Sequence, residues 1–236
     1  MDRDGALEFW RRSRWRLPSE PADLRYLYGA TTQGGAARFG TVYQLTPPGA
    51  GLTTWRRTVL YSFRGVNPSD PAGDGASPNG SLIFDTKGAD FDTPTPFRFG
   101  TVFRLTPPAR GPGALATEWT ETVLHRFAYG EIPGLHGHAN SGLIFDTEGA
   151  LYGTTGGVPM DFQGGVVYKL TPPLGSQTGW TIAKLYTFSG GPSGGVPVGG
   201  LIFGQAGALY GATFNYGPSE VYYPPGYGVV FQITAP

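Results

Sequence analysis

Short runs of β-branched, aromatic and aliphatic residues follow one another along the chain, and each run is bounded by Gly, Pro, Asp or Ser. This pattern is typical of β-strands joined by tight turns. Residues 114–129 contain neither Gly nor Pro and could form a helix, but the matching runs elsewhere read TTWRR and TGWTI. We therefore predict a strand there as well, and an all-β chain.

The runs belong to four phrases that return in a fixed order about 60 residues apart, which identifies a tandem repeat. The phrase LIFD, which we name strand A, is found at residues 82–85 and 143–146, and at 201–204 as LIFG. Strand B, LYGAT in its first copy, begins at Leu27, Asp90, Leu151 and Leu209. Strand C, GTVYQLTPP in its first copy, begins at Gly40, Gly100, Gly165 and Gly228. Strand D, WRRTVLYSF in its first copy, begins at Trp55, Trp119 and Trp180. The second copy of strand B reads DFD in place of LYG, so we expect a less regular strand there.

Four strands joined in sequence order form an antiparallel meander, and meanders packed radially form a β-propeller. We predict one β-propeller-like domain of about four repeats over residues 26–236, the alternative being an open or incomplete propeller. Residues 1–25 are a degenerate N-terminal segment, and a truncated repeat is one interpretation because MDRDGAL at 1–7 matches FDTEGAL at 145–151. A ring of four could close if residues 8–17, EFWRRSRWRL, supplied the outer strand that the last repeat lacks. Otherwise the exposed strand edges favour oligomerisation.

The connections divide between the two ends of such a meander. Strands A and B are joined by a short Asp-x-x-Gly turn, for which we predict that Asp85 and Asp146 bond the backbone, while Gly204 replaces the acid in the last copy. The B-to-C and D-to-A connections lie together at the other end and differ in length and composition between repeats. Variable loops on a rigid scaffold are the usual place for binding.

Composition and charge narrow the function classes. Gly and Pro, at 39 and 22 residues, would indicate disorder in a chain without a period, but 14% aromatic residues supply surface to bury. The formal net charge is zero, which gives no global attraction for nucleic acid. We find no apolar run long enough to span a membrane, no signal peptide in the given chain and no cysteine.

The loop YGPSEVYYPPGYG is the most distinctive unrepeated segment. Its Pro-stiffened rings could stack on a sugar or contact a protein at low entropic cost, although they could also only cover the end of the array. The candidate ligand-binding residues are these four tyrosines and an acid from a D-to-A loop: Tyr216, Tyr222, Tyr223, Tyr227 and Glu131.

Metal, cofactor and catalytic chemistry have no convincing signature. His136 and His138 have a spacing that could place two imidazoles on one ion, but no third ligand is evident. His125 occupies the place of Tyr61 and Tyr186 in other copies of strand D, which predicts aromatic packing. DPAGDG at residues 70–75 lacks the alternating acids of a calcium loop, so we expect a solvated polar turn. We predict no cofactor, no metal site and no catalytic residue.

The combination of LIFDTEGALYGTTGG, GGVVYKLTPP, a Trp and KLYTF resembles the bacterial Gloeo/Verruco tandem repeat, or GloVer repeat, over roughly residues 26–236. The chain is also similar, more weakly, to the propeller repeats in sensor domains of two-component regulators. The GloVer resemblance implies a bacterial exported or surface-anchored protein, extracellular or at the cell surface, and brings no catalytic residues with it.

Three functions follow from these patterns. The first is a non-enzymatic exported repeat protein that binds glycan or protein through the B-to-C and D-to-A connections. The second is a polysaccharide-active propeller enzyme, a lyase or hydrolase, whose acids meet at that end: Asp74, Glu131, Asp161 and Glu220. The third is a truncated repeat fragment without an independent function.

Overall fold

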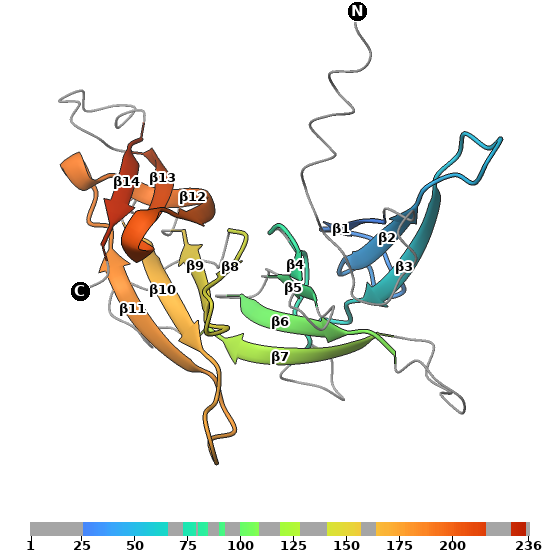
Figure 1. Cartoon of the computed structure of the whole chain (residues 1–236), viewed down its shortest axis with the longest axis horizontal. Helices are drawn as coiled ribbons and strands as arrows, with labels where there is room; N and C mark the ends of the chain where they lie inside the picture. The colour runs from blue at the N-terminus through green and yellow to red at the C-terminus, as the bar shows by residue number, and fades with distance from the viewer. Residues whose placement is uncertain are drawn as a thin grey trace, which may run out of the picture.

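The computed structural model describes residues 26–65, 73–78, 80–84, 90–92, 100–108, 119–127, 141–156, 164–215 and 228–234. These residues form four antiparallel sheets that follow one another along the chain (Figure 1). Helical structure among them is confined to two short 3-10 segments, η1 (Gly191–Ser193) and η2 (Gln205–Gly207). No helix in this part of the chain is long and apolar enough to cross a bilayer.

Each sheet contains the strands of one sequence repeat in sequence order, as the repeat pattern predicts. The first sheet consists of β1 (Leu27–Thr31), β2 (Thr41–Thr46) and β3 (Arg56–Ser62). The second consists of β4 (Ile83–Phe84), β5 (Asp90–Asp92), β6 (Thr101–Thr106) and β7 (Thr120–Arg126). The third consists of β8 (Ile144–Phe145), β9 (Leu151–Thr155), β10 (Val166–Thr171) and β11 (Thr181–Thr187). The fourth consists of β12 (Gly195–Phe203), β13 (Leu209–Asn215) and β14 (Val230–Ile233).

Strands B and C pair in the same register in every sheet. An aromatic residue of strand C lies opposite a glycine of strand B in three of them, in the pairs Gly29–Tyr43, Gly153–Tyr168 and Gly211–Phe231. The glycine is needed because a Cβ added at Gly29 would lie 2.6 Å from the Tyr43 hydroxyl. In the second sheet Asp92 lies opposite Phe103, which confirms DFD as a copy of strand B. That copy forms a strand of three residues where the others have five or more.

Strand D carries one extra residue opposite strand C in each of the first three sheets. The register shifts at Val42/Tyr43, Val102/Phe103 and Val167/Tyr168, which leaves Leu60, Leu124 and Leu185 without a partner across the ladder. Such a bulge bends the strand and redirects its side chains. All three leucines pack against buried clusters.

The core lies between consecutive sheets, in three clusters that use equivalent positions. The valine after the start of strand C packs with leucines and aromatic residues of the next sheet. The phenylalanine that follows strand D makes an edge-to-face contact with the strand C aromatic of the next sheet, in the pairs Phe63–Phe103, Phe127–Tyr168 and Phe188–Phe231. Their ring centroids are 5.1, 5.1 and 4.9 Å apart, in the favourable range for aromatic pairs. The four sheets therefore form a continuous arc, with the first and fourth sheets at its two ends (Figure 1).

Candidate functional site

The B-to-C and D-to-A connections are bonded to each other at the end of the sheet where strand C begins. The amide of the phenylalanine after strand D donates to the carbonyl of the glycine that opens strand C, from Phe63 to Gly40 at 3.0 Å and from Phe188 to Gly165 at 3.0 Å. The D-to-A connection adds a second bond, from the amide of Ser77 to the carbonyl of Phe39 at 2.7 Å. The equivalent bond in the third repeat joins Val196 to Gly164 at 3.1 Å. The scaffold thus fixes where both variable connections leave the sheet.

A glycine and a proline complete this joint. Gly40 and Gly165 have φ angles of +104° and +100°, which L side chains rarely adopt. The rings of Pro78 and Pro197 occupy the space beside them, so that a Cβ at Gly165 would lie 2.5 Å from Cδ of Pro197. The glycine that opens strand C is therefore required both by its backbone conformation and by this packing.

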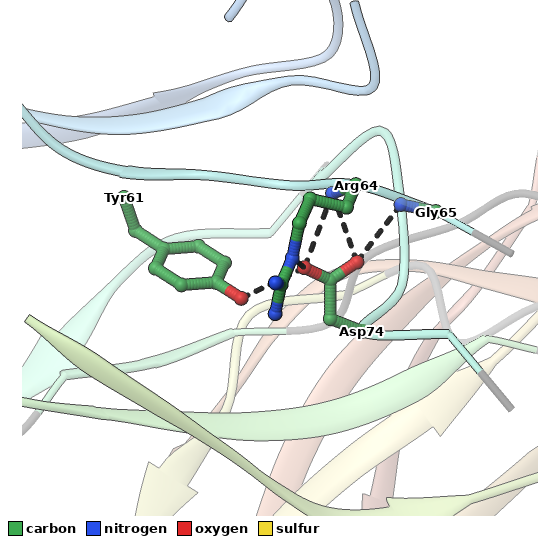
Figure 2. A network of polar contacts seen from close by, with 4 residues as sticks. All are labelled: Tyr61, Arg64, Gly65 and Asp74. Atoms are coloured by element: carbon green, nitrogen blue, oxygen red, sulfur yellow. Dashed lines mark hydrogen bonds and ion pairs between the residues drawn. The ribbon is translucent and has the colours of Figure 1, made fainter. Parts of the chain in front are cut away.

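A buried carboxylate holds the D-to-A connection of the first repeat (Figure 2). Oδ1 of Asp74 accepts hydrogen bonds from the amides of Arg64 at 2.9 Å and Gly65 at 2.8 Å. Oδ2 accepts from the Tyr61 hydroxyl at 2.7 Å and from the amide and Nε of Arg64 at 3.1 and 3.4 Å. Asp74 is only 3% exposed, so the solvated polar turn expected at residues 70–75 is wrong for this residue, while residues 70–72 lie outside the described part of the chain. The carboxylate can be buried because its oxygens receive backbone amide and side-chain donors.

The electrostatics of this cluster suit a structural role. Burial raises the pKa of Tyr61, and the hydrogen bond to Asp74 and its negative charge raise it further, so the hydroxyl stays a proton donor. Both oxygens of Asp74 are already occupied, which leaves this acid poorly placed for acid–base chemistry on an external substrate. The Arg64 side chain is 69% exposed and places a cation beside the connection.

In the third repeat, the start of the D-to-A connection is fixed by hydrogen bonds that involve no acid. Gly190 corresponds to Gly65, since both are the second residue after the phenylalanine of strand D and both have positive φ. The Ser193 hydroxyl donates to the carbonyl of Gly190 at 2.8 Å, and the amide of Gly190 donates to the carbonyl of Gly194 at 3.2 Å. Because no acid recurs at this place, repeat comparison gave no signal for the role of Asp74.

A second charged cluster lies at the turn between β8 and β9 and confirms the turn role of Asp146. Its Oδ1 accepts from the amides of Glu148 and Ala150 at 3.0 and 2.8 Å. Its Oδ2 accepts from the Tyr152 hydroxyl at 3.0 Å and lies 3.3 Å from Nζ of Lys169. Burial raises the pKa of this carboxyl, but the hydrogen bonds from Ala150, Tyr152 and Lys169 outweigh burial and hold it below its ordinary value.

In the last copy of this turn the backbone alone closes it, with the amide of Gly204 2.7 Å from the carbonyl of Ala208.

The other candidate residues have mixed outcomes. His125 makes an edge-to-face contact with Phe127, as Tyr61 and Tyr186 do with their phenylalanines, which confirms its aromatic packing. Most of the predicted site lies outside the described residues: Tyr216, Tyr222, Tyr223, Tyr227, Glu131, His136, His138, Asp85, Asp161 and Glu220. Within the described ranges, no group of three or more acidic or histidine side chains could hold a metal ion.

Comparison with known proteins agrees with the repeat pattern. No curated protein sequence matches this chain. The profile of the Gloeobacter/Verrucomicrobia repeat matches residues 19–223, which span the strands of all four sheets except β14. With coordinated strand phrases in all four sheets and a match over most of its length, the chain belongs to the Gloeobacter/Verrucomicrobia repeat family.

Proposed function

We propose that the four sheets are blades of a β-propeller-like scaffold and that the protein binds a glycan or a protein through its B-to-C and D-to-A connections. The observation that carries this proposal is the fixed joint between them, with bonds from Phe63, Phe127 and Phe188 repeated in three sheets. A rigid scaffold that gathers variable connections at one end is the usual arrangement of a binding surface. The protein acts without catalysis, outside the cell or at its surface, as the family resemblance implies.

The proposed contact residues are the tyrosines of the last B-to-C connection and Glu131, together with Arg64, one of the described cations at this end. Tyrosine supplies a large ring with few rotatable bonds, which lowers the entropic cost of binding. The exposed guanidinium of Arg64 favours ligands that carry carboxylates, such as polyuronates or acidic protein surfaces.

A binding assay with matched variants tests this proposal. We expect the Tyr222→Ala, Tyr223→Ala double variant to bind polygalacturonate, or another ligand found in a panel that includes neutral glucans, at least about tenfold more weakly, since two stacking rings are lost. Trp55→Ala is the control, because Trp55 is an exposed aromatic residue at the opposite end of its sheet, 42% exposed. Unchanged affinity of the double variant, or an equal loss in the control, would count against this surface.

Polysaccharide cleavage is the alternative function. The described acid that this alternative names, Asp74, already has its oxygens bonded within the chain. Release of reducing ends from a polysaccharide during the same binding assay would favour an enzyme, and a chain that shows no cooperative unfolding would favour a fragment without an independent function.

A further inference from the structure

The contact between consecutive sheets is built from two complementary faces. The leading face of one sheet presents the valine of strand C and the isoleucine of strand A, and the trailing face of the next presents the leucine of strand B with the aromatic and aliphatic residues of strand C. In the third cluster Val167 and Ile144 meet Leu209, Phe231 and Ile233. The strand C positions meet in the other two clusters as well, where Val42 packs with Phe103 and Leu105, and Val102 packs with Tyr168 and Leu170 and also with Leu151 of strand B.

Within the described residues, the fourth sheet has a leading face that no following sheet covers. Val230 is 82% exposed, whereas its equivalents Val42, Val102 and Val167 are each 0% exposed. Ile202 is 65% exposed, while its equivalents Ile83 and Ile144 pack against clusters. These valines and isoleucines therefore differ in exposure because of the neighbouring sheet and not because of residue type.

The first sheet has a trailing face that no other described sheet covers. Leu27 is 45% exposed, whereas its equivalents Leu151 and Leu209 are 0% and 3% exposed. Tyr43 and Leu45 are half-buried, as are Phe231 and Ile233 in the fourth sheet, whereas the residues at the same places in the second and third sheets are fully buried. The two ends of the arc thus carry the two halves of one interface (Figure 1).

We propose that these two faces bind each other between copies of this chain, so that the leading face of the fourth sheet contacts the trailing face of the first sheet of a second copy. This contact would continue the stacking of the sheets, because it would repeat a contact that the chain already makes three times. The faces stand at opposite ends of the arc, so each can meet its counterpart on another molecule. The contact is head-to-tail, and two copies can satisfy all four faces by closing into one ring.

Burial of these apolar side chains supplies the driving force. Exposed aliphatic residues at Val230, Ile202 and Leu27 lose accessible surface on association, at about 25 cal/mol per Å². The occupant that competes with a second copy is the N-terminal segment, which would close the ring within one molecule. The proposal holds whichever ligand the connections bind.

Sedimentation velocity of the full chain over a range of concentrations tests the proposal, with one variant for each face. Wild type should form a species of at least twice the 25.1 kDa of one chain. Val230→Glu and Leu27→Glu should each remain monomeric at the concentrations where wild type associates. Leu174→Glu is the matched control, because Leu174 is an apolar residue 70% exposed between β10 and β11, and it should associate as wild type does.

Mixing the two face variants gives the decisive measurement. Val230→Glu keeps an intact trailing face and Leu27→Glu keeps an intact leading face, so an equimolar mixture should form a heterodimer that neither variant forms alone. Thermal unfolding followed by circular dichroism checks that both variants fold, as their exposed positions lead us to expect. A monomeric wild type at all concentrations would overturn the proposal and favour closure within one chain, and a mixture that remains monomeric would overturn the head-to-tail arrangement.

Discussion

At the residue scale, the molecule uses carboxylate oxygens to bond the backbone of connections between strands. Asp74 bonds the amides of Arg64 and Gly65, and Asp146 bonds those of Glu148 and Ala150. A carboxylate does this well because it accepts several hydrogen bonds at once, and bonds to a charged acceptor are stronger than neutral ones. The Asp74 carboxylate is buried, so water cannot replace its hydrogen bonds when the acid is removed.

Asp74→Asn should destabilise the protein by about 2–3 kcal/mol, the range for hydrogen bonds to a charged group and a buried partner left unmatched. The amide keeps one oxygen for the amides of Arg64 and Gly65 but turns an NH₂ donor toward the Tyr61 hydroxyl and the guanidinium. Urea unfolding at neutral pH measures the change. Tyr61→Phe removes a single bond and should cost about 1 kcal/mol. If Asp74→Asn costs no more than Tyr61→Phe, the charge contributes nothing.

At the element scale, the start of strand C is the point where the B-to-C and D-to-A connections meet. Gly165 sits between the carbonyl of Thr155 and the ring of Pro197, and its own carbonyl accepts from the amide of Phe188. The same arrangement surrounds Gly40, with Thr31 and Pro78 in the equivalent places. This joint holds four strands and two variable connections in place. A substitution that distorts it should therefore destabilise the whole sheet.

Gly165→Ala should cost about 3 kcal/mol or more, since it adds a steric clash to the strain of a positive φ. Gly175→Ala separates the two effects, because Gly175 has a φ of +60° but no atom within 4 Å of an added Cβ. That control should lose only about 1 kcal/mol. Chemical unfolding of both variants gives the comparison, and equal losses would mean that the neighbouring proline and carbonyl move aside without cost.

The elements were largely predictable from the sequence, because the signals that define them repeat. The phrases beginning at Leu151 and Gly165 predicted strands and their order, and even DFD at residues 90–92 was assigned to the correct partner. The role of Asp74 was not predictable, because its partners Tyr61, Arg64 and Gly65 lie at the other end of a connection whose sequence no other repeat shares. A repeat pattern reveals only what the repeats share, and an acid present in one repeat alone gives no such signal.

At the scale of the whole molecule, burial depends on a residue's place in the arc as much as on its chemistry. Each sheet buries its faces only against its neighbours, which is the property of repeat architectures. Val102 and Val230 stand at the same place in strand C, yet one is fully buried and the other is 82% exposed. No sequence pattern within a repeat distinguishes these two valines, because the difference is the presence of a following sheet.

Paired truncations at these two valines measure the difference directly. Val102→Ala should cost about 2 kcal/mol, from the lost transfer energy of two carbons and the cavity that remains. Val230→Ala should cost nearly nothing in dilute solution, because its side chain is mostly in water. Head-to-tail association would bury Val230, so its cost should rise with protein concentration while the cost of Val102→Ala stays constant. Thermal unfolding of both variants at several concentrations measures this, and a Val230→Ala cost near 2 kcal/mol that does not change with concentration would instead indicate burial of Val230 within a single chain.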